Sequence, residues 1–114
     1  MNLRKKRVAF YCRYASDKHL DEQMMNFLEL SAIHSIQTSK AMYFEDKVPG
    51  NREGFAKMYA NALNQNFDIL IINSYHVIDL DIFNYFSVEK DLKKLEIEIL
   101  LYYPILGREL HDQI

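Results

Sequence analysis

Several residue types are scarce in this chain of 114 residues, and each scarcity argues against a class of protein. The single cysteine, Cys12, can form no internal disulfide, which predicts a protein of the reducing cytoplasm. Only three glycines are present, and no glycine-rich loop follows the first predicted strand, which argues against nucleotide binding. No apolar run is long enough to span a bilayer, and the first residues lack a signal-peptide pattern. We therefore expect a cytoplasmic domain that does not enter a membrane.

The charge balance is close to neutral. Fourteen lysines and arginines against sixteen acidic residues leave a net charge of −2, whereas a dedicated nucleic-acid-binding module is usually basic. The exception is the cluster of residues 4–7, Arg-Lys-Lys-Arg, for which we favour a solubilising flank over a contact with DNA. His19, His34 and His111 are scattered without partners at ligand spacing, so we expect neither a metal site nor another cofactor.

Strand-like and helix-like segments alternate along the chain. The predicted strands are residues 7–14, 41–45, 68–73 and 97–102, and the predicted helices are 17–35, 53–64 and one that starts at Asp79 or Asp81 and runs to about residue 95. Four consecutive aliphatic residues in segment 68–73 indicate a central parallel strand. This alternation predicts a single α/β domain over residues 1–114, with three layers (α/β/α) and a mostly parallel sheet of four to five strands. The last ten residues are left open between a short helix and an irregular end.

Helical spacing of apolar residues predicts which side of each helix faces the sheet. The expected inward residues are Leu20, Met24, Phe27, Leu28, Ser31 and Ala32 in the first helix, Phe55, Met58, Tyr59, Ala62 and Leu63 in the second, and Ile82, Phe83, Phe86, Leu92 and Leu95 in the third. Four tyrosines need not all fit into so small a core, and any exposed ones would anchor an interface, although ordinary packing is the commoner role: Tyr75, Tyr85, Tyr102 and Tyr103.

The first predicted strand runs Arg-Val-Ala-Phe-Tyr-Cys-Arg-Tyr-Ala-Ser over residues 7–16, and it turns polar after Arg13. This segment resembles the first strand of the serine recombinase (resolvase/invertase) catalytic domain, in which Tyr-x-Arg-x-Ser carries the serine that attacks a DNA phosphate. Tyr11 and Arg13 match that pattern, but Ala15 stands at the position of the serine. The resemblance implies a resolvase-like fold and a lineage in DNA recombination and integration by mobile elements.

The resemblance extends over about residues 7–102. Gln23 falls where the family has a glutamine early in its first helix. Arg52, between Gly50 and Gly54, matches the family arginine that helps to hold the scissile phosphate. The resemblance thus implies that Tyr11, Arg13, Gln23 and Arg52 are retained positions of a phosphate site.

The chain departs from the family after the third strand. Where the family has an Asp-Arg pair and a second arginine three residues later, this chain has His76, Val77 and Leu80. Alanine cannot attack a phosphate and aliphatic side chains cannot stabilise its charge, so the resemblance implies a catalytically inactive relative, a pseudoenzyme. No separate DNA-binding domain is recognised in the sequence, so DNA binding is expected to be weak. We expect the domain to act through contacts with itself, as a dimer, or with a related recombinase.

Two alternatives remain open. In the first, the chain is an active site-specific recombinase that uses Ser16 as a displaced nucleophile. A shift of one residue turns a strand side chain to the opposite face, however, and Ser16 is also well placed to cap the following helix. In the second, the chain is a doubly wound module in which Arg13 and Arg52 hold an anion. His76 would then sit near Arg13, although the commoner role for it is a polar residue on a turn.

Overall fold

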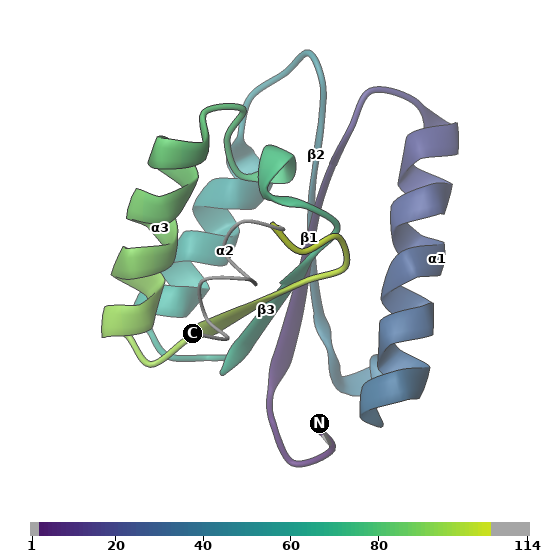
Figure 1. Ribbon diagram of the computed structural model, residues 1–114, viewed down its shortest axis with the longest axis vertical. Helices are drawn as coiled ribbons and strands as arrows, with labels where there is room; N and C mark the ends of the chain where they lie inside the picture. The colour runs from purple at the N-terminus through teal and green to yellow at the C-terminus, as the bar shows by residue number, and fades with distance from the viewer. Residues whose placement is uncertain (1–2, 106–114) are drawn as a thin grey trace.

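The computed structural model describes residues 3–105, and its elements follow the predicted order (Figure 1). They are β1 (Val8–Tyr14), α1 (Asp17–His34), the 3-10 helix η1 (Thr38–Lys40), β2 (Met42–Lys47), α2 (Glu53–Leu63), β3 (Ile69–Ile72), the 3-10 helix η2 (Tyr75–Val77), α3 (Ile82–Lys94) and β4 (Glu98–Leu101). The two 3-10 turns were not predicted. Of the last ten residues, whose structure the sequence left open, 106–114 lie outside the described part.

The four described strands form one sheet in the order β2-β1-β3-β4, and every pair is parallel. Helix α1 covers one face of the sheet, while α2 and α3 cover the other (Figure 1). The predicted three-layer α/β/α architecture is therefore confirmed. Each helix carries the chain back to start another parallel strand, so the carboxyl ends of all four strands gather at one edge.

The two central strands bury side chains on both of their faces. Along β1, Val8, Phe10 and Cys12 pack in the layer of α1, whereas Ala9 and Tyr11 pack in the layer of α2 and α3. Residues of β3 alternate in the same way, because successive side chains of a strand point to opposite faces. The continuous aliphatic run of β3 is thus explained by a strand paired on both sides and covered on both faces.

Ser16 caps α1. Its backbone is extended, and its Oγ accepts a hydrogen bond from the backbone N–H of His19 at 3.3 Å. This satisfies one of the N–H groups that the first turn of a helix leaves without an intrahelical partner. The helix ends at Ser35, whose left-handed conformation closes the last turn. The predicted role of Ser16 as a helix cap is confirmed.

Four residues predicted to face inward are exposed instead: Leu28, Ala32, Leu63 and Phe83. The clearest case is Phe83, which is 76% exposed, while Tyr85 and Leu92 are fully buried on the same helix. Phe83 lies about 200° around the helix from Tyr85, so both cannot meet the sheet. Burial of Tyr85 also removes it from the tyrosines available as interface anchors. Leu28 and Leu63 each follow a buried residue directly and are turned about 100° away from it.

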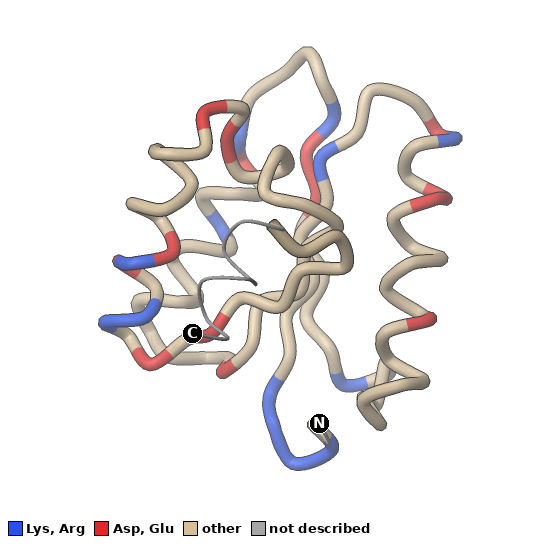
Figure 2. Tube along the Cα trace, in the orientation of Figure 1, with Lys and Arg blue, Asp and Glu red and all other residues tan. Residues whose placement is uncertain are grey.

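Within residues 3–105, no helix is both long and apolar enough to cross a membrane. The basic residues near the N-terminus lie at the amino ends of the strands, away from the edge where the strands end (Figure 2). There Arg7 pairs with Asp68 through two hydrogen bonds from its guanidinium group. This position separates the basic cluster from the candidate site described next.

Candidate functional site

An open cavity of about 370 Å³ lies at the carboxyl edge of the sheet, between the ends of β1 and β3. Its walls bring together six of the predicted positions: Arg13, Ala15, Gln23, His76, Val77 and Leu80. Tyr14, His19, Val48, Asn73 and Ser74 complete the lining. Because β1 and β3 are neighbours in the sheet, the loops that follow them must meet at this point. The sequence-based location of the site is therefore the location of a real cavity.

Ala15 and Ser16 take different positions at the end of β1. Ala15 is exposed and lines the cavity beside Arg13. Among the described residues Ser16 is not part of this lining, and its hydroxyl group is engaged at the start of α1. The one-residue difference in the sequence thus separates a methyl group in the cavity from a hydroxyl group that caps a helix.

Gln23 connects the cavity wall to the strand. Its Nε2 donates to the carbonyl oxygen of Arg13 at 2.8 Å, and the side chain is buried. The Oε1 atom of Gln23 is buried and has no hydrogen-bond partner among the described residues. The contact fixes the backbone of Arg13 where the strand leaves the sheet.

Arg52 does not line the cavity, because its guanidinium group is held in the interior next to it. Nη1 donates to the carbonyl of Ile78 at 2.6 Å, and Nη2 donates to the carbonyl of Val77 at 3.0 Å and to the hydroxyl of Tyr11 at 3.1 Å. The guanidinium carbon also lies 4.4 Å from the centre of the Phe55 ring, a cation–π distance. Arg52 therefore braces the η2 loop against β1, while Arg13 is the arginine that lines the cavity.

A buried carboxylate, which the sequence did not single out, completes this brace. Asp46 accepts hydrogen bonds from the Tyr11 hydroxyl at 2.7 Å and from the backbone N–H groups of Gly54 and Phe55, each at 2.8 Å. It thereby caps α2 from a neighbouring strand, since the N-cap residue Arg52 makes no side-chain cap of its own. The sequence offered one signal for this role. Asp46 is a charged residue near the end of β2, and the helix that follows, α2, has no capping side chain of its own.

Burial is the main cause that raises the pKa of Tyr11 to about 12. The hydroxyl of Tyr11 donates its proton to Asp46 and accepts a hydrogen bond from Arg52, so loss of the proton would break the bond to Asp46. Tyr11 is therefore a neutral member of the brace at physiological pH and not an acid or base of the cavity.

The cavity is lined by one arginine and two histidines, Arg13, His19 and His76, and no carboxylate is among its described lining residues. The ring of His76 stacks on that of Tyr75, with 4.0 Å between the ring centres. Such a set of groups favours an anion over a cation. Among the described residues, no group of three or more His, Cys, Asp or Glu side chains is arranged to hold a metal ion.

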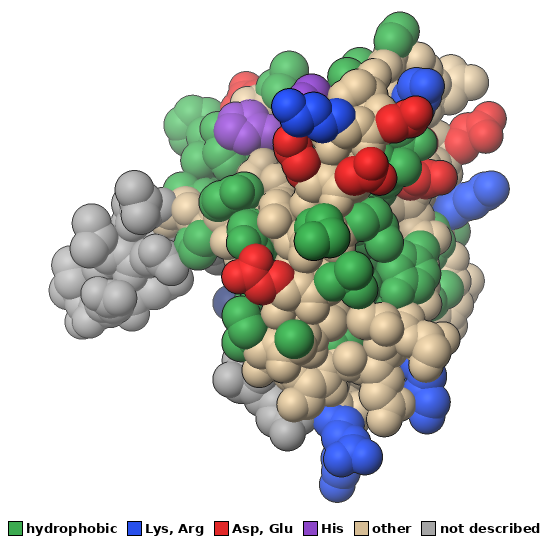
Figure 3. Space-filling view, turned by 90° about the vertical axis from the view of Figure 1, so that its right-hand side faces the viewer, with side chains coloured by type: hydrophobic (Ala, Val, Ile, Leu, Met, Phe, Trp, Pro, Cys, Tyr) green, Lys and Arg blue, Asp and Glu red, His purple; other side chains and the backbone are tan. Residues whose placement is uncertain are grey.

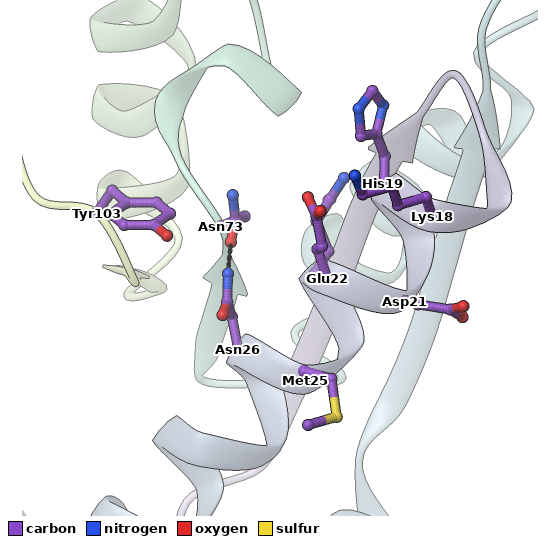
Figure 4. Close-up of a pocket in the computed structure, with 9 residues that line it drawn as sticks. Lys18, His19, Asp21, Glu22, Met25, Asn26, Asn73 and Tyr103 are labelled. Carbon is purple, nitrogen blue, oxygen red and sulfur yellow. Dashed lines mark hydrogen bonds between the residues drawn. The ribbon is translucent and has the colours of Figure 1, made fainter.

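A second cavity, of about 750 Å³, adjoins the first on the side of β4 (Figure 4). The two share His19, Gln23 and Asn73. In the second cavity Asn26 donates a hydrogen bond to Asn73, and the side chains of Lys18 and Glu22 both reach its rim (Figure 4). Asp21 and Glu22 outnumber Lys18 in its lining, so this cavity does not share the preference of the first for an anion.

Comparison with known proteins places the fold. No protein-family model and no curated protein sequence matches the chain. Among solved structures, the chain is similar to the C-terminal catalytic domain of ISC1926 TnpA, an IS607-like serine recombinase, with a TM-score of 0.72 and 13% identity over 94% of this chain and 77% of that one. It is similar to the N-terminal catalytic domain of TP901-1 integrase, with a TM-score of 0.73 and 17% identity over 85% of this chain and 77% of that one. A serine recombinase from Sulfolobus solfataricus gives a TM-score of 0.63 and 18% identity over 95% of this chain and 77% of that one. The chain has the fold of serine recombinase catalytic domains, as its sequence predicted.

Proposed function

We propose that this chain is a catalytically silent domain of a DNA-recombination lineage associated with mobile elements, and that it acts through protein contacts. The observation that supports it most is the division of roles at the end of β1. Ala15 lies in the cavity beside Arg13, while the hydroxyl of Ser16 caps α1. A phosphoryl transfer needs a nucleophile aligned with the phosphate, and the methyl group of alanine has no lone pair to attack with.

The cavity also offers few groups that could stabilise the negative charge of a reacting phosphate. Val77 and Leu80 line the cavity without charge or donors. To reach a bound phosphate, Arg52 would have to give up hydrogen bonds to two backbone carbonyls and to Tyr11. Loss of one well-placed donor to a transition state typically costs about a hundredfold in rate. Arg13 alone is too little to stabilise the charge on a reacting phosphate.

The test is to look for a covalent link between protein and DNA. The purified chain is incubated with supercoiled plasmid and with a randomised duplex library, denatured, and analysed for labelled protein–DNA adducts. We expect no adduct from the wild type, from Ser16→Ala or from Ala15→Ser, because Arg52 stays in its brace in all three.

An adduct formed by the wild type would overturn the proposal. If that adduct disappears in Ser16→Ala, the active recombinase with a displaced nucleophile is the correct function. Ser74→Ala and Tyr14→Phe remove the other hydroxyl groups of the cavity and identify the linked residue if Ser16 is not responsible.

A second candidate function, an anion-binding module, is favoured by the three cationic or titratable side chains of the cavity. Arg13, His19 and His76 replace the pair of Arg13 and Arg52 expected from the sequence, because Arg52 is turned inward. Titration with inorganic phosphate, followed by amide chemical shifts, should move the signals of residues 13–16 and 73–77. Arg13→Gln should abolish these shifts, and their persistence in that variant would dispose of this candidate.

A further inference from the structure

The outer surface of α1 exposes an apolar patch together with the neighbouring edge strand. The patch consists of Met25, Leu28 and Ala32 on α1 and Tyr43 on β2, and we call it the α1–β2 patch. Met25 is 66% exposed, and Leu28 and Tyr43 are each 48% exposed. Spacings of three and four residues place the three helix residues on one side of α1, as neighbours along the helix.

Tyr43 extends the patch from the helix onto the sheet. It pairs in register with Phe10, whose side chain lies in the layer of α1, so Tyr43 points to the same face. Its ring packs edge-on against Phe27 at 5.6 Å, and its hydroxyl donates to the carbonyl of Thr38. These contacts fix the ring beside the helix, so the patch has a rigid border.

Carboxylates continue the patch toward the start of α1. Asp21 and Asp17 lie on the same side of the helix as Leu28, about two and three turns before it, and both are exposed. On β2, the exposed Glu45 and Lys47 point to the same face as Tyr43 and offset each other in charge, so the acidic character comes from α1. Figure 3 shows hydrophobic side chains in the middle of this face and a group of acidic side chains above them. Helix α1 carries four carboxylates and one lysine, a net charge of −3.

We propose that the α1–β2 patch and its acidic end bind a basic amphipathic helix of a partner protein. This inference names the chemistry of the partner required by the proposed function, and it rests on that function for its biological role. From residue 17 to residue 32 the surface follows α1 for about 22 Å, which matches a partner helix of about four turns. The partner would place apolar side chains over Met25 and Leu28 and lysine or arginine side chains near Asp17 and Asp21.

Charge complementarity favours a basic partner helix over DNA and over a second copy of this chain. DNA is disfavoured because the carboxylates would face its phosphates. A second copy of the chain is disfavoured in both symmetric arrangements of α1. A parallel pair of helices would set the acidic ends against each other, and an antiparallel pair would bury carboxylates such as Asp21 against apolar side chains without partners.

The test measures binding of the full chain to a synthetic peptide of about 18 residues with leucine at heptad spacing and lysine elsewhere. Affinity is measured by fluorescence anisotropy at low and high salt. A scrambled peptide of the same composition is the control for the ligand. Leu28→Gln and Asp21→Lys alter the two halves of the surface. Leu63→Gln makes the same change at another exposed leucine, on α2 at the other face of the sheet.

We expect Leu28→Gln to weaken binding about tenfold, since it removes an apolar contact at the centre of the patch. Asp21→Lys should weaken binding about fivefold at low salt and less at high salt, because exposed charges are screened. Leu63→Gln should bind like the wild type, and the scrambled peptide should bind at least about tenfold more weakly, because it presents no continuous apolar stripe.

Equal binding by all variants, or no binding by the wild type, would overturn the proposal. The proposal would also be overturned if sedimentation showed a dimer of the chain that the Leu28→Gln substitution dissociates and that added peptide does not dissociate. These outcomes are distinct from those of the DNA experiment. A protein–DNA adduct would refute catalytic silence without affecting peptide binding, and a failure to bind the peptide would leave the absence of an adduct intact.

Discussion

At the scale of single residues, the positions named by the family resemblance fall into two groups. Arg13 faces the cavity, and Gln23 holds its backbone carbonyl. Tyr11 and Arg52 belong instead to a buried brace with Asp46. A buried polar group is stabilising only when its hydrogen bonds are made, so the brace should respond strongly to the loss of one member.

Tyr11→Phe removes the hydroxyl that donates to Asp46 and accepts from Arg52. We expect the free energy of unfolding to fall by about 2 kcal/mol, because the buried Asp46 and the half-buried Arg52 each lose a hydrogen-bond partner. Urea denaturation measures this loss. Tyr103→Phe, at an exposed tyrosine, is the matched control and should change the free energy by less than about 0.5 kcal/mol. Equal effects of the two substitutions would mean that the brace contributes nothing to stability.

The sequence identified several residues of the site, but it did not identify the residues that hold them in place by hydrogen bonds. Tyr11, Arg13 and Arg52 were recognisable from a motif, whereas Asp46 was not. Its role depends on the register between β1 and β2, which sets Tyr11 opposite Phe44 and brings a strand end to the start of α2. Such long-range pairing has no local signature along the chain.

At the scale of elements, every predicted strand and helix exists, and the errors concern their ends and sides. Strand β2 continues to Lys47, beyond the predicted end at residue 45, because β1 offers pairing partners as far as Tyr14. The wrongly assigned Phe83 shows why sides are harder to predict. Apolar residues at 82, 83, 85 and 86 spread over about 160° of the helix surface, and only packing against the sheet selects which of them are buried.

The start of α2 approaches β2 so closely that only glycine fits at position 54. A Cβ atom on Gly54 would lie 2.1 Å from the carbonyl oxygen of Glu45, closer than any real contact. We expect Gly54→Ala to lower the free energy of unfolding by about 3 kcal/mol, despite the better helix propensity of alanine. Urea denaturation is again the measurement.

Ala60→Gly serves as the control for this substitution. It lies at an exposed position of the same helix, and it should cost only about 1 kcal/mol through the flexibility of glycine. A Gly54→Ala variant as stable as the wild type would show that α2 and β2 can move apart without loss.

At the scale of the whole molecule, one sheet separates two cores, and Cys12 reports on the layer of α1. Its thiol is buried beneath that helix, and burial, with Glu45 and Asp46 nearby, raises its pKa from 9.0 to about 12. The folded state therefore keeps a proton that the unfolded state releases above about pH 9. Tyr11 acts in the same direction between its ordinary pKa of 10.0 and about 12.

The free energy of unfolding should consequently not depend on these two groups below about pH 8 and should fall as the pH rises from about 9 to 12. Cys12→Ala should make the fall smaller between about pH 9 and 10, where the unfolded thiol ionises before tyrosine. Denaturation at several pH values measures both curves. Identical slopes for the two proteins in this range would contradict the assignment to Cys12.

The brace around Arg52 also bears on how such a sequence is inherited. A guanidinium group that ties a loop to a strand can be maintained by selection for folding alone, whether or not the cavity beside it binds a ligand. Its persistence in a lineage is therefore no sign that phosphate is still handled there. Under the proposed function, a serine at position 15 would not by itself create a site that cleaves DNA, because Arg52 would remain bonded to two backbone carbonyls and to Tyr11.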